Sequence, residues 1–269
     1  MNNYSVLISV YFKEKDSFLR LSLESVFNQT IKPTEVVLVK DGPLTPELDK
    51  VIEEYEHKYT ELKVVRLVQN VGLGKALNEG LKHCSYELVA RMDTDDVCKS
   101  HRFEQQLKFF EEHPEVDVCS SWIDEFIENT ENVVSQRKLP ETHEDIFRFA
   151  KGRCPINHPA VMYRRSKVLE VGGYQGFPED MFLWVKLLMN GAKFYNIQES
   201  LLYFRTSEDV YKRRGGWKYA KDDMKTQWTF YKMRFLSFPQ MCKNIIIRAS
   251  VRLMPNSLRT LVYKRLLRK

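Results

Sequence analysis

Three aspartates and an arginine are crowded into six residues, Arg91 to Asp96, with the sequence RMDTDD. They follow YELV, which is typical of the start of a buried strand. Carboxylates this close raise one another's pKa and cost free energy unless a positive charge compensates them. Because oxygen ligands suit Mg²⁺ or Mn²⁺, the pattern predicts a divalent-cation site. A solvated turn or a helix cap is the alternative that the spacing alone leaves open.

Other polar residues also follow predicted strands. Tyr11 comes at the end of SVLISVYF, Asp41 at the end of EVVLVKDG, and Asn70 shortly after KVVRLV. In an open parallel sheet, ligands bind beyond the carboxyl ends of the strands. We therefore expect these three residues and the acidic cluster at 93–96 to converge on one edge of a sheet.

The first half of the chain alternates between strand and helix patterns. Apolar β-rich runs at 5–12, 35–42, KVVRLV, YELVARM and VDVCSSWI are separated by segments with helical spacing. This alternation predicts βαβ units with right-handed crossovers, and so an α/β fold with a mainly parallel sheet flanked by helices. In the second half we expect a short strand and a helix before Gly172–Gly173. A helix from PED, two short strands (AKFYNI and SLLYFRT) and helices from Gly216 should follow, with breaks near Pro239 and Pro255.

Charge is distributed unevenly along the 269 residues. Residues 211–269 hold sixteen Lys and Arg but only two acids, a net charge of +14, whereas residues 1–210 carry a net charge of −8. The basic segment favours an anionic partner such as a membrane, a nucleic acid or a phosphorylated ligand. From MPNSLRTLVYKRLLRK we predict a basic amphipathic helix that can lie on an anionic membrane, with packing on its own globule as the alternative.

The five cysteines are odd in number and include no CxxC pair, so a disulfide framework or a zinc site is not expected. The sequence opens with a strand pattern rather than a signal-peptide pattern, and no apolar run approaches about 20 residues. We therefore expect a cytoplasmic protein that can lie on the inner face of a membrane through its basic tail.

Six pieces of the sequence, in order, resemble the family-2 glycosyltransferases, the inverting group with the GT-A fold. They are SVLISVYF, EVVLVKDG, QNVGLGKALNEGL, ELVARMDTDD, NHPAVMYRRSKVLEVGGY and PEDMFLWVKLLMNGAKF, within residues 4–205. The tail resembles bacterial members that build capsule or O-antigen repeat units. The resemblance implies a GT-A domain over 1–210, with a nucleotide-binding half (1–100) and an acceptor-binding half (101–210). A basic helical extension over 211–269 follows.

The resemblance also implies roles for the residues at the strand ends. Asp95 and Asp96 are expected to hold Mn²⁺ or Mg²⁺, with Asp95 as the main ligand. Asp93 is expected to contact the nucleotide. The other expected nucleotide contacts are Tyr11, Asp41, Asn70, Lys75 and two arginines of a basic loop, Arg213 and Arg214. Ordinary turn chemistry is the alternative for Asp41 and for the glycine-rich turn, and we expect Asn78 only to cap or to cross-brace.

In the acceptor-binding half, the resemblance makes Asp180 the general base and Glu179 an acceptor or sugar contact. The alternative for this acid pair is stabilisation of the first helical turn. His158 is expected either to line the acceptor pocket or to be a structural histidine, and Trp184 is expected in the core.

Together these residues predict an inverting transferase that moves a sugar from a UDP-hexose to a glycan on a polyprenyl diphosphate. A nucleotidyltransferase is a weaker alternative, because SVYFKEKDS lacks the glycines of its usual loop. A nucleic-acid-binding protein or an inactive scaffold is the other alternative, which the acidic first part of the chain disfavours. We therefore expect no nucleic-acid partner.

Overall fold

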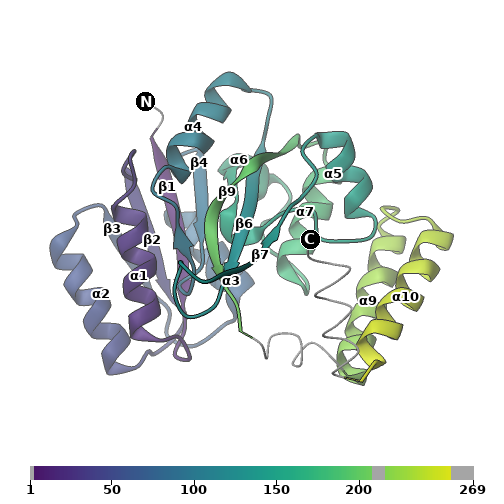
Figure 1. Ribbon diagram of the computed structural model, residues 1–269, viewed down its shortest axis with the longest axis horizontal. Coiled ribbons are helices and arrows are strands. Elements are labelled where there is room, and N and C mark those ends of the chain that lie inside the picture. Colours follow the sequence, from purple (N-terminus) through teal and green to yellow (C-terminus); the bar gives the residue numbers. More distant parts are fainter. Residues whose placement is uncertain (1–2, 208–215, 256–269) are drawn as a thin grey trace.

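The computed structural model describes residues 3–207 and 216–255. Within these residues nine strands form one sheet. Four neighbouring strands run parallel, in the spatial order β3 (Leu62–Arg66), β2 (Glu35–Lys40), β1 (Tyr4–Val10) and β4 (Leu88–Met92). The sequence-based prediction of a parallel sheet built from the first half of the chain is confirmed (Figure 1).

The sheet continues past β4 through strands of the second half. β8 pairs antiparallel with both β4 and β6, β6 pairs parallel with β9, and β5 and β7 pair antiparallel with β9 and β6. Their bounds are Val97–Cys98 (β5), Val118–Phe126 (β6), Val133–Arg137 (β7), Met162–Arg164 (β8) and Phe194–Arg205 (β9). β9 is one strand with irregular pairing opposite Ser121–Ile123, so the prediction of two short strands there was wrong.

Helices cover both faces of the sheet. One core cluster packs α1 (Asp16–Phe27), α2 (Pro46–Lys58) and α4 (Arg102–Glu112) on one face. A second cluster packs α3 (Leu73–His83), α5 (His143–Ala150), α6 (Arg165–Glu170) and α7 (Glu179–Met189) on the other. The side chains of β1 alternate between the two clusters, with Val6 and Ile8 in the first and Leu7 in the second. Strands buried on both faces read as nearly continuous apolar runs, which is why the first four were visible in the sequence.

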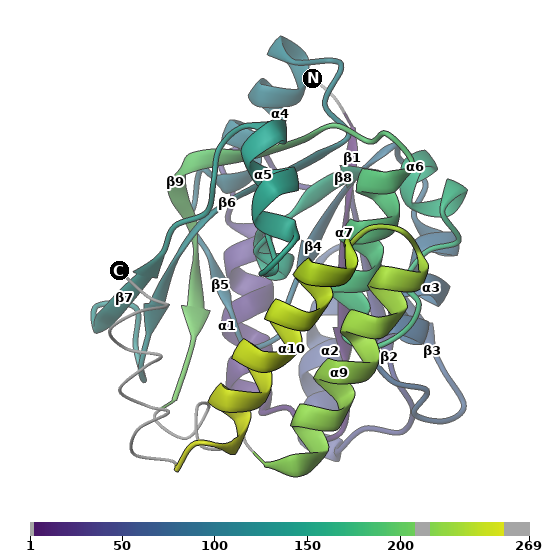
Figure 2. The same ribbon diagram turned by 90° about the vertical axis from the view of Figure 1, so that its right-hand side faces the viewer.

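A helical hairpin of α9 (Trp217–Lys232) and α10 (Phe238–Leu253) packs against the second cluster. Phe230, Phe235 and Leu236, at the turn of the hairpin, belong to this cluster. α10 begins with a capping box between Ser237 and Gln240. Figure 1 shows the hairpin at the opposite end of the molecule from α2, and Figure 2 shows its two helices side by side.

The predicted break near Pro239 is confirmed, because this proline lies in the first turn of α10. The helix predicted beyond Pro255 lies outside the described residues. Among the residues that the structure describes, no helix is both long enough and apolar enough to span a bilayer.

Candidate active site

The acidic cluster lies directly after β4, at the carboxyl end of the parallel strands. One carboxylate oxygen from each of Asp93, Asp95 and Asp96 lies within 4.8 Å of the others. Asp96 is fully buried, and its Oδ1 accepts a hydrogen bond from the backbone N–H of Arg205 (2.8 Å). Its Oδ2 is also buried and has no hydrogen-bond partner in residues 3–207 or 216–255. A buried carboxylate oxygen without a partner is costly, so this oxygen is a natural position for a cation ligand.

The electrostatics of the cluster point the same way. Burial, followed by the charges of Asp93 and Glu14, raises the pKa of Asp95 to about 7. Burial, followed by the charges of Asp95 and Asp93, raises the pKa of Asp96 well above its ordinary value. A divalent cation would favour the charged forms of both groups, and three converging carboxylates are the hard oxygen ligands that Mg²⁺ and Mn²⁺ prefer. The residues present therefore fit such an ion.

Arg91 connects the acidic cluster to the rest of the site. Its side chain is 1% exposed and forms an ion pair with Asp93. Its charge also acts on the pKa of His158 and on that of Glu179, the first residue of α7. Its Nε and Nη1 are buried without a hydrogen-bond partner in the described part of the chain. One buried cation thus pairs with the acidic cluster and also acts electrostatically on Glu179 at the start of α7.

Asp41 organises the turn that follows β3. Its Oδ1 accepts from the N–H of Val71 (2.7 Å), and its Oδ2 accepts from the N–H of Gly72 (3.1 Å) and from Nδ2 of Asn70 (3.0 Å). The predicted convergence of Asp41 and Asn70 is confirmed. The carboxylate also has the bracing role that the turn-chemistry alternative implied.

Tyr11 and Lys75 lie near the same edge. β1 ends at Val10, so Tyr11 lies outside the strand that was predicted to include it, and it is 44% exposed. Lys75 is exposed in the first turn of α3.

Asn78 exchanges two hydrogen bonds with the backbone of Tyr174 (2.7 and 2.8 Å), which confirms the expected cross-brace.

A second pair of acids, Glu179 and Asp180, forms the first turn of α7. Oδ1 of Asp180 accepts from the N–H of Met181 (2.7 Å), and its Oδ2 accepts from the thiol of Cys154 (3.6 Å). Burial raises the pKa of Cys154 to about 12, so the thiol keeps its proton at neutral pH. Burial also raises the pKa of Glu179. A Cβ on Gly74 would lie 3.2 Å from Cβ of Glu179, so the start of α3 closely approaches the start of α7.

His158 is partly buried and contacts Tyr174 and Trp184. One of its ring nitrogens, Nε2, lies 3.0 Å from Oη of Tyr174, and the ring meets the edge of Trp184 at 5.8 Å between centroids. Burial, followed by the charge of Arg91, holds the pKa of His158 well below its ordinary value, so the imidazole is neutral at pH 7. Trp184 is fully buried, as predicted.

Sequence reasoning missed three residues at the site. Arg205 donates from Nε to the carbonyl of Asp95 (2.8 Å), Glu14 accepts from Oγ1 of Thr94 (2.7 Å), and Cys154 donates to Asp180. The only signal for Arg205 was its position at the end of an apolar run. Arg213 and Arg214, predicted as diphosphate contacts, lie outside the described residues.

A mainly parallel sheet flanked by helices on both faces, followed by C-terminal helices, is the fold of GT-A glycosyltransferases. Solved structures share this fold. A structure of S. aureus TarS in complex with UDP-GlcNAc has a TM-score of 0.63 at 20% identity, covering 84% of this chain and 65% of that one. The mannosyltransferase PcManGT from Pyrobaculum calidifontis, in complex with GDP-Man and Mn²⁺, has a TM-score of 0.65 at 14% identity. The match covers 97% of this chain and 74% of that one.

Sequence comparisons identify the family. The model of glycosyl transferase family 2 matches residues 5–173. An Escherichia coli protein named UDP-Gal:alpha-D-GlcNAc-diphosphoundecaprenol beta-1,3-galactosyltransferase is 40% identical, covering 99% of this chain and 97% of its own. The amylovoran biosynthesis glycosyltransferase AmsE of Erwinia amylovora is 37% identical, and the match covers 97% of this chain and 98% of AmsE. The chain belongs to glycosyltransferase family 2.

Proposed function

We propose that the protein transfers a hexose from a UDP-sugar to a glycan carried on a polyprenyl diphosphate, in the assembly of a bacterial surface polysaccharide. Similarity along nearly the whole length of two bacterial relatives supports this proposal, and one of them is named for a UDP-galactose donor and a diphosphoundecaprenol acceptor. In the proposal, residues 1–210 form the transferase domain and residues 211–269 a basic extension.

Asp95 and Asp96 would hold Mn²⁺ or Mg²⁺, because their carboxylates converge and Oδ2 of Asp96 has no hydrogen-bond partner in the described ranges. When bound, such an ion offsets negative charge on the diphosphate of the donor. Arg91 keeps Asp93 oriented through their ion pair, so Asp93 can face the nucleotide without adding an uncompensated charge.

The nucleotide would lie along the edge formed by the ends of β1, β2 and β4. Tyr11 offers an exposed ring for the base, and Asn70 and Lys75 line the start of α3. Each carboxylate oxygen has two lone pairs, so Asp41 can brace its turn and still accept from a base N–H. Arg213 and Arg214 remain proposed contacts of the diphosphate.

The transfer itself would be a single displacement. The acceptor hydroxyl oxygen forms a bond to the anomeric carbon while the bond from that carbon to the diphosphate oxygen breaks. The bonding electron pair leaves with UDP, and the hydroxyl proton passes to the carboxylate of Asp180. Inversion of a UDP-α-hexose would give a β-linkage. Cys154 and the N–H of Met181 keep the Asp180 carboxylate oriented.

Glu179 and His158 would contact the acceptor. Glu179 lies close enough to Asp180, Arg91 and Asp93 for their charges to act on its pKa, so the donor and acceptor sides meet at this residue. His158 is neutral, and its hydrogen bond to Tyr174 uses one ring nitrogen, which leaves the other for the acceptor or for structure. The convergence of the three strand-end carboxylates within 4.8 Å, in a chain that the family-2 model matches, is the observation that carries the proposal.

Attachment to an anionic membrane would bring the enzyme to such an acceptor. The tail at 256–269 is the proposed anchor. The hairpin next to it exposes large apolar side chains, including Trp217 (63% exposed) and Ile246 (66%). Exposed lysines lie among them: Lys218, Lys221, Lys225, Lys232 and Lys243. Aromatic and basic side chains on one surface favour binding at the lipid–water interface.

The proposal is tested by incubating the purified protein with a panel of nucleotide-sugars, with Mn²⁺, with Mg²⁺ and with a chelator. We expect slow metal-dependent hydrolysis of one UDP-sugar, and faster turnover when a sugar linked to a lipid diphosphate is added. Hydrolysis of none of the donors under any of these conditions would contradict the proposal.

A further inference from the structure

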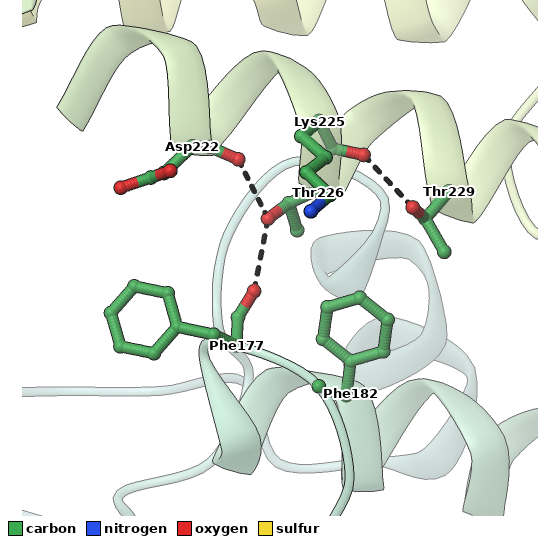
Figure 3. A pocket seen from close by; sticks show the side chains of 7 residues that line it. Phe177, Phe182, Asp222, Lys225, Thr226 and Thr229 are labelled. Atoms are coloured by element: carbon green, nitrogen blue, oxygen red, sulfur yellow. Dashed lines mark hydrogen bonds between the residues drawn. The ribbon is translucent and has the colours of Figure 1, made fainter. Parts of the chain in front are cut away.

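A cavity of about 190 Å³ lies between α9 and the segment that leads into α7. Gly176, Phe177 and Phe182 form one wall, and Asp222, Lys225, Thr226 and Thr229 of α9 form the other. Figure 3 shows the two phenylalanine rings on the same side of this space and the polar residues of α9 opposite them. None of these residues belongs to the donor site described above.

The cavity is built into the fold. The hydroxyl of Thr226 lies within hydrogen-bond distance of two carbonyls, that of Phe177 (3.1 Å) and that of Asp222 one turn earlier in α9 (2.9 Å), so α9 and the segment are in direct polar contact. Phe182 packs on Phe230 with 4.9 Å between ring centroids. Gly176 has φ +74°, and a Cβ there would lie 2.8 Å from the ring of Phe182. Any larger residue at position 176 would therefore displace the aromatic wall.

The cavity adjoins the proposed catalytic base. Phe177 precedes Asp180 by three residues, so their Cα atoms are separated by at most about 11 Å. The same short segment approaches α9 at Phe177 and α3 at Glu179, which faces Gly74. Asp180 lies three residues beyond Phe177, in the first turn of α7. A molecule in the cavity would therefore lie next to the segment that carries the proposed base.

The lining fits a sugar that carries a phosphate. Phe177 is 61% exposed although it lines a cavity, and an exposed ring offers a flat apolar surface to the C–H face of a sugar. In Figure 3 the amino group of Lys225 and the carboxylate of Asp222 lie apart along α9. A carboxylate suits sugar hydroxyls, whereas an ammonium group suits a phosphate.

We infer that this cavity binds the first sugar and the adjoining phosphate of a lipid-linked acceptor, with the sugar on Phe177 and the phosphate on Lys225. The inference rests on the proposed transfer to a polyprenyl-diphosphate acceptor and names the subsite for it. It also agrees with the surface of the hairpin. Lys225 lies one helical turn from the exposed Lys221 and Trp228, so a phosphate bound there is close to the proposed lipid-facing side chains.

Two water-soluble probes test this subsite: an N-acetylhexosamine α-diphosphate with a short alkyl tail, and the matching alkyl glycoside without phosphates. Lys225→Gln should raise the KM for the diphosphate probe about tenfold and leave the KM for the glycoside unchanged. Phe177→Ala should raise both KM values roughly two- to tenfold. Lys225→Arg and Phe177→Tyr should restore most of the affinity.

Lys108→Gln, an exposed lysine on α4, is the matched control and should keep the wild-type KM for both probes. Transfer by the wild type with unchanged acceptor KM values in Lys225→Gln and Phe177→Ala would overturn the inference and leave the proposed function standing. Absence of transfer to any sugar diphosphate by the wild type would overturn the proposed acceptor class, and the inference with it.

Discussion

The backbone N–H of Arg205, the last residue of β9, donates to Oδ1 of Asp96 at 2.8 Å across 109 positions of sequence. The side chain of Arg205 donates to the carbonyl of Asp95 (2.8 Å) and lies over the ring of Phe18. Strand β9, which lies between β6 and β5 in the sheet, thus fixes the acidic turn that follows β4. Asp96 keeps its second oxygen available because the first is held by a backbone donor.

The first prediction concerns the metal. In calorimetry the wild type should bind UDP tightly in a metal-dependent manner, and Asp95→Ala and Asp96→Ala should each lose this binding, because both carboxylates are proposed ligands of the ion. Mn²⁺ alone should raise the Tm of the wild type and not that of either variant. At a metal concentration of 100 times Kd, this stabilisation corresponds to about 2.7 kcal/mol.

The control for the metal prediction is Asp124→Asn, which removes a carboxylate that is paired with Lys99 outside the cluster. This variant should bind UDP with Mn²⁺ as the wild type does. Unchanged metal-dependent affinity in both cluster variants would remove Asp95 and Asp96 from the metal site.

Much of the proposed nucleotide and metal site could be predicted from the sequence, because its residues follow strands that are buried on both faces. Such strands appear as apolar runs, and parallel strands bring their carboxyl ends to one edge. Asp41 and the acids at 93–96 could therefore be placed together without knowledge of a single contact. Asn78 could be expected to cap or to cross-brace, but its partner Tyr174 lies 96 positions away and could not be identified from the sequence.

The remainder depended on contacts that leave no local pattern. β5 has two residues and β7 alternates weakly, so neither was predicted, and α5 was missed as well. The polar stretch around Gln198 suggested a break, whereas β9 continues through it with irregular pairing to β6. Arg91 could be assigned to a strand, but its burial depends on its ion pair with Asp93.

The second prediction separates the two roles of Asp41. Asp41→Ala removes the charged acceptor for the N–H groups of Val71 and Gly72, and a hydrogen bond to a charged group contributes about 1.5–3 kcal/mol. We expect a lower Tm and weaker UDP binding. Asp41→Asn keeps one acceptor oxygen and should recover part of the stability while UDP binding stays weak. Wild-type UDP affinity in Asp41→Asn would leave Asp41 with the bracing role alone.

The third prediction concerns the membrane. Removal of residues 256–269 should weaken co-sedimentation with vesicles of anionic lipid, while transfer to a water-soluble acceptor persists. Each basic residue near an anionic surface contributes about 1 kcal/mol, and this segment carries five. Vesicles of zwitterionic lipid serve as the control and should bind neither form. Full-length protein that ignores anionic vesicles at low salt would assign the tail a structural role.

The fourth prediction concerns the general base. Asp180→Asn keeps the shape of the side chain and an oxygen for the N–H of Met181, but it cannot take the proton of the acceptor hydroxyl. Loss of a general base typically lowers the rate about 10²–10⁴-fold. Binding of the UDP-sugar should survive, because the donor is held by the strand-end residues on the other side of Arg91. The expected result is a large fall in kcat with nearly unchanged donor affinity, measured by steady-state kinetics and calorimetry.

Glu179→Gln is the matched variant for the same test, because it neutralises the neighbouring acid in the same helical turn. It should weaken acceptor binding more than it lowers kcat. Equal loss of donor binding in Asp180→Asn would indicate that Asp180 acts in the cap of α7 rather than in proton transfer. Wild-type turnover in Asp180→Asn, together with a large fall in kcat in Glu179→Gln, would move the base to Glu179. Wild-type turnover in both variants would exclude a carboxylate base at the start of α7.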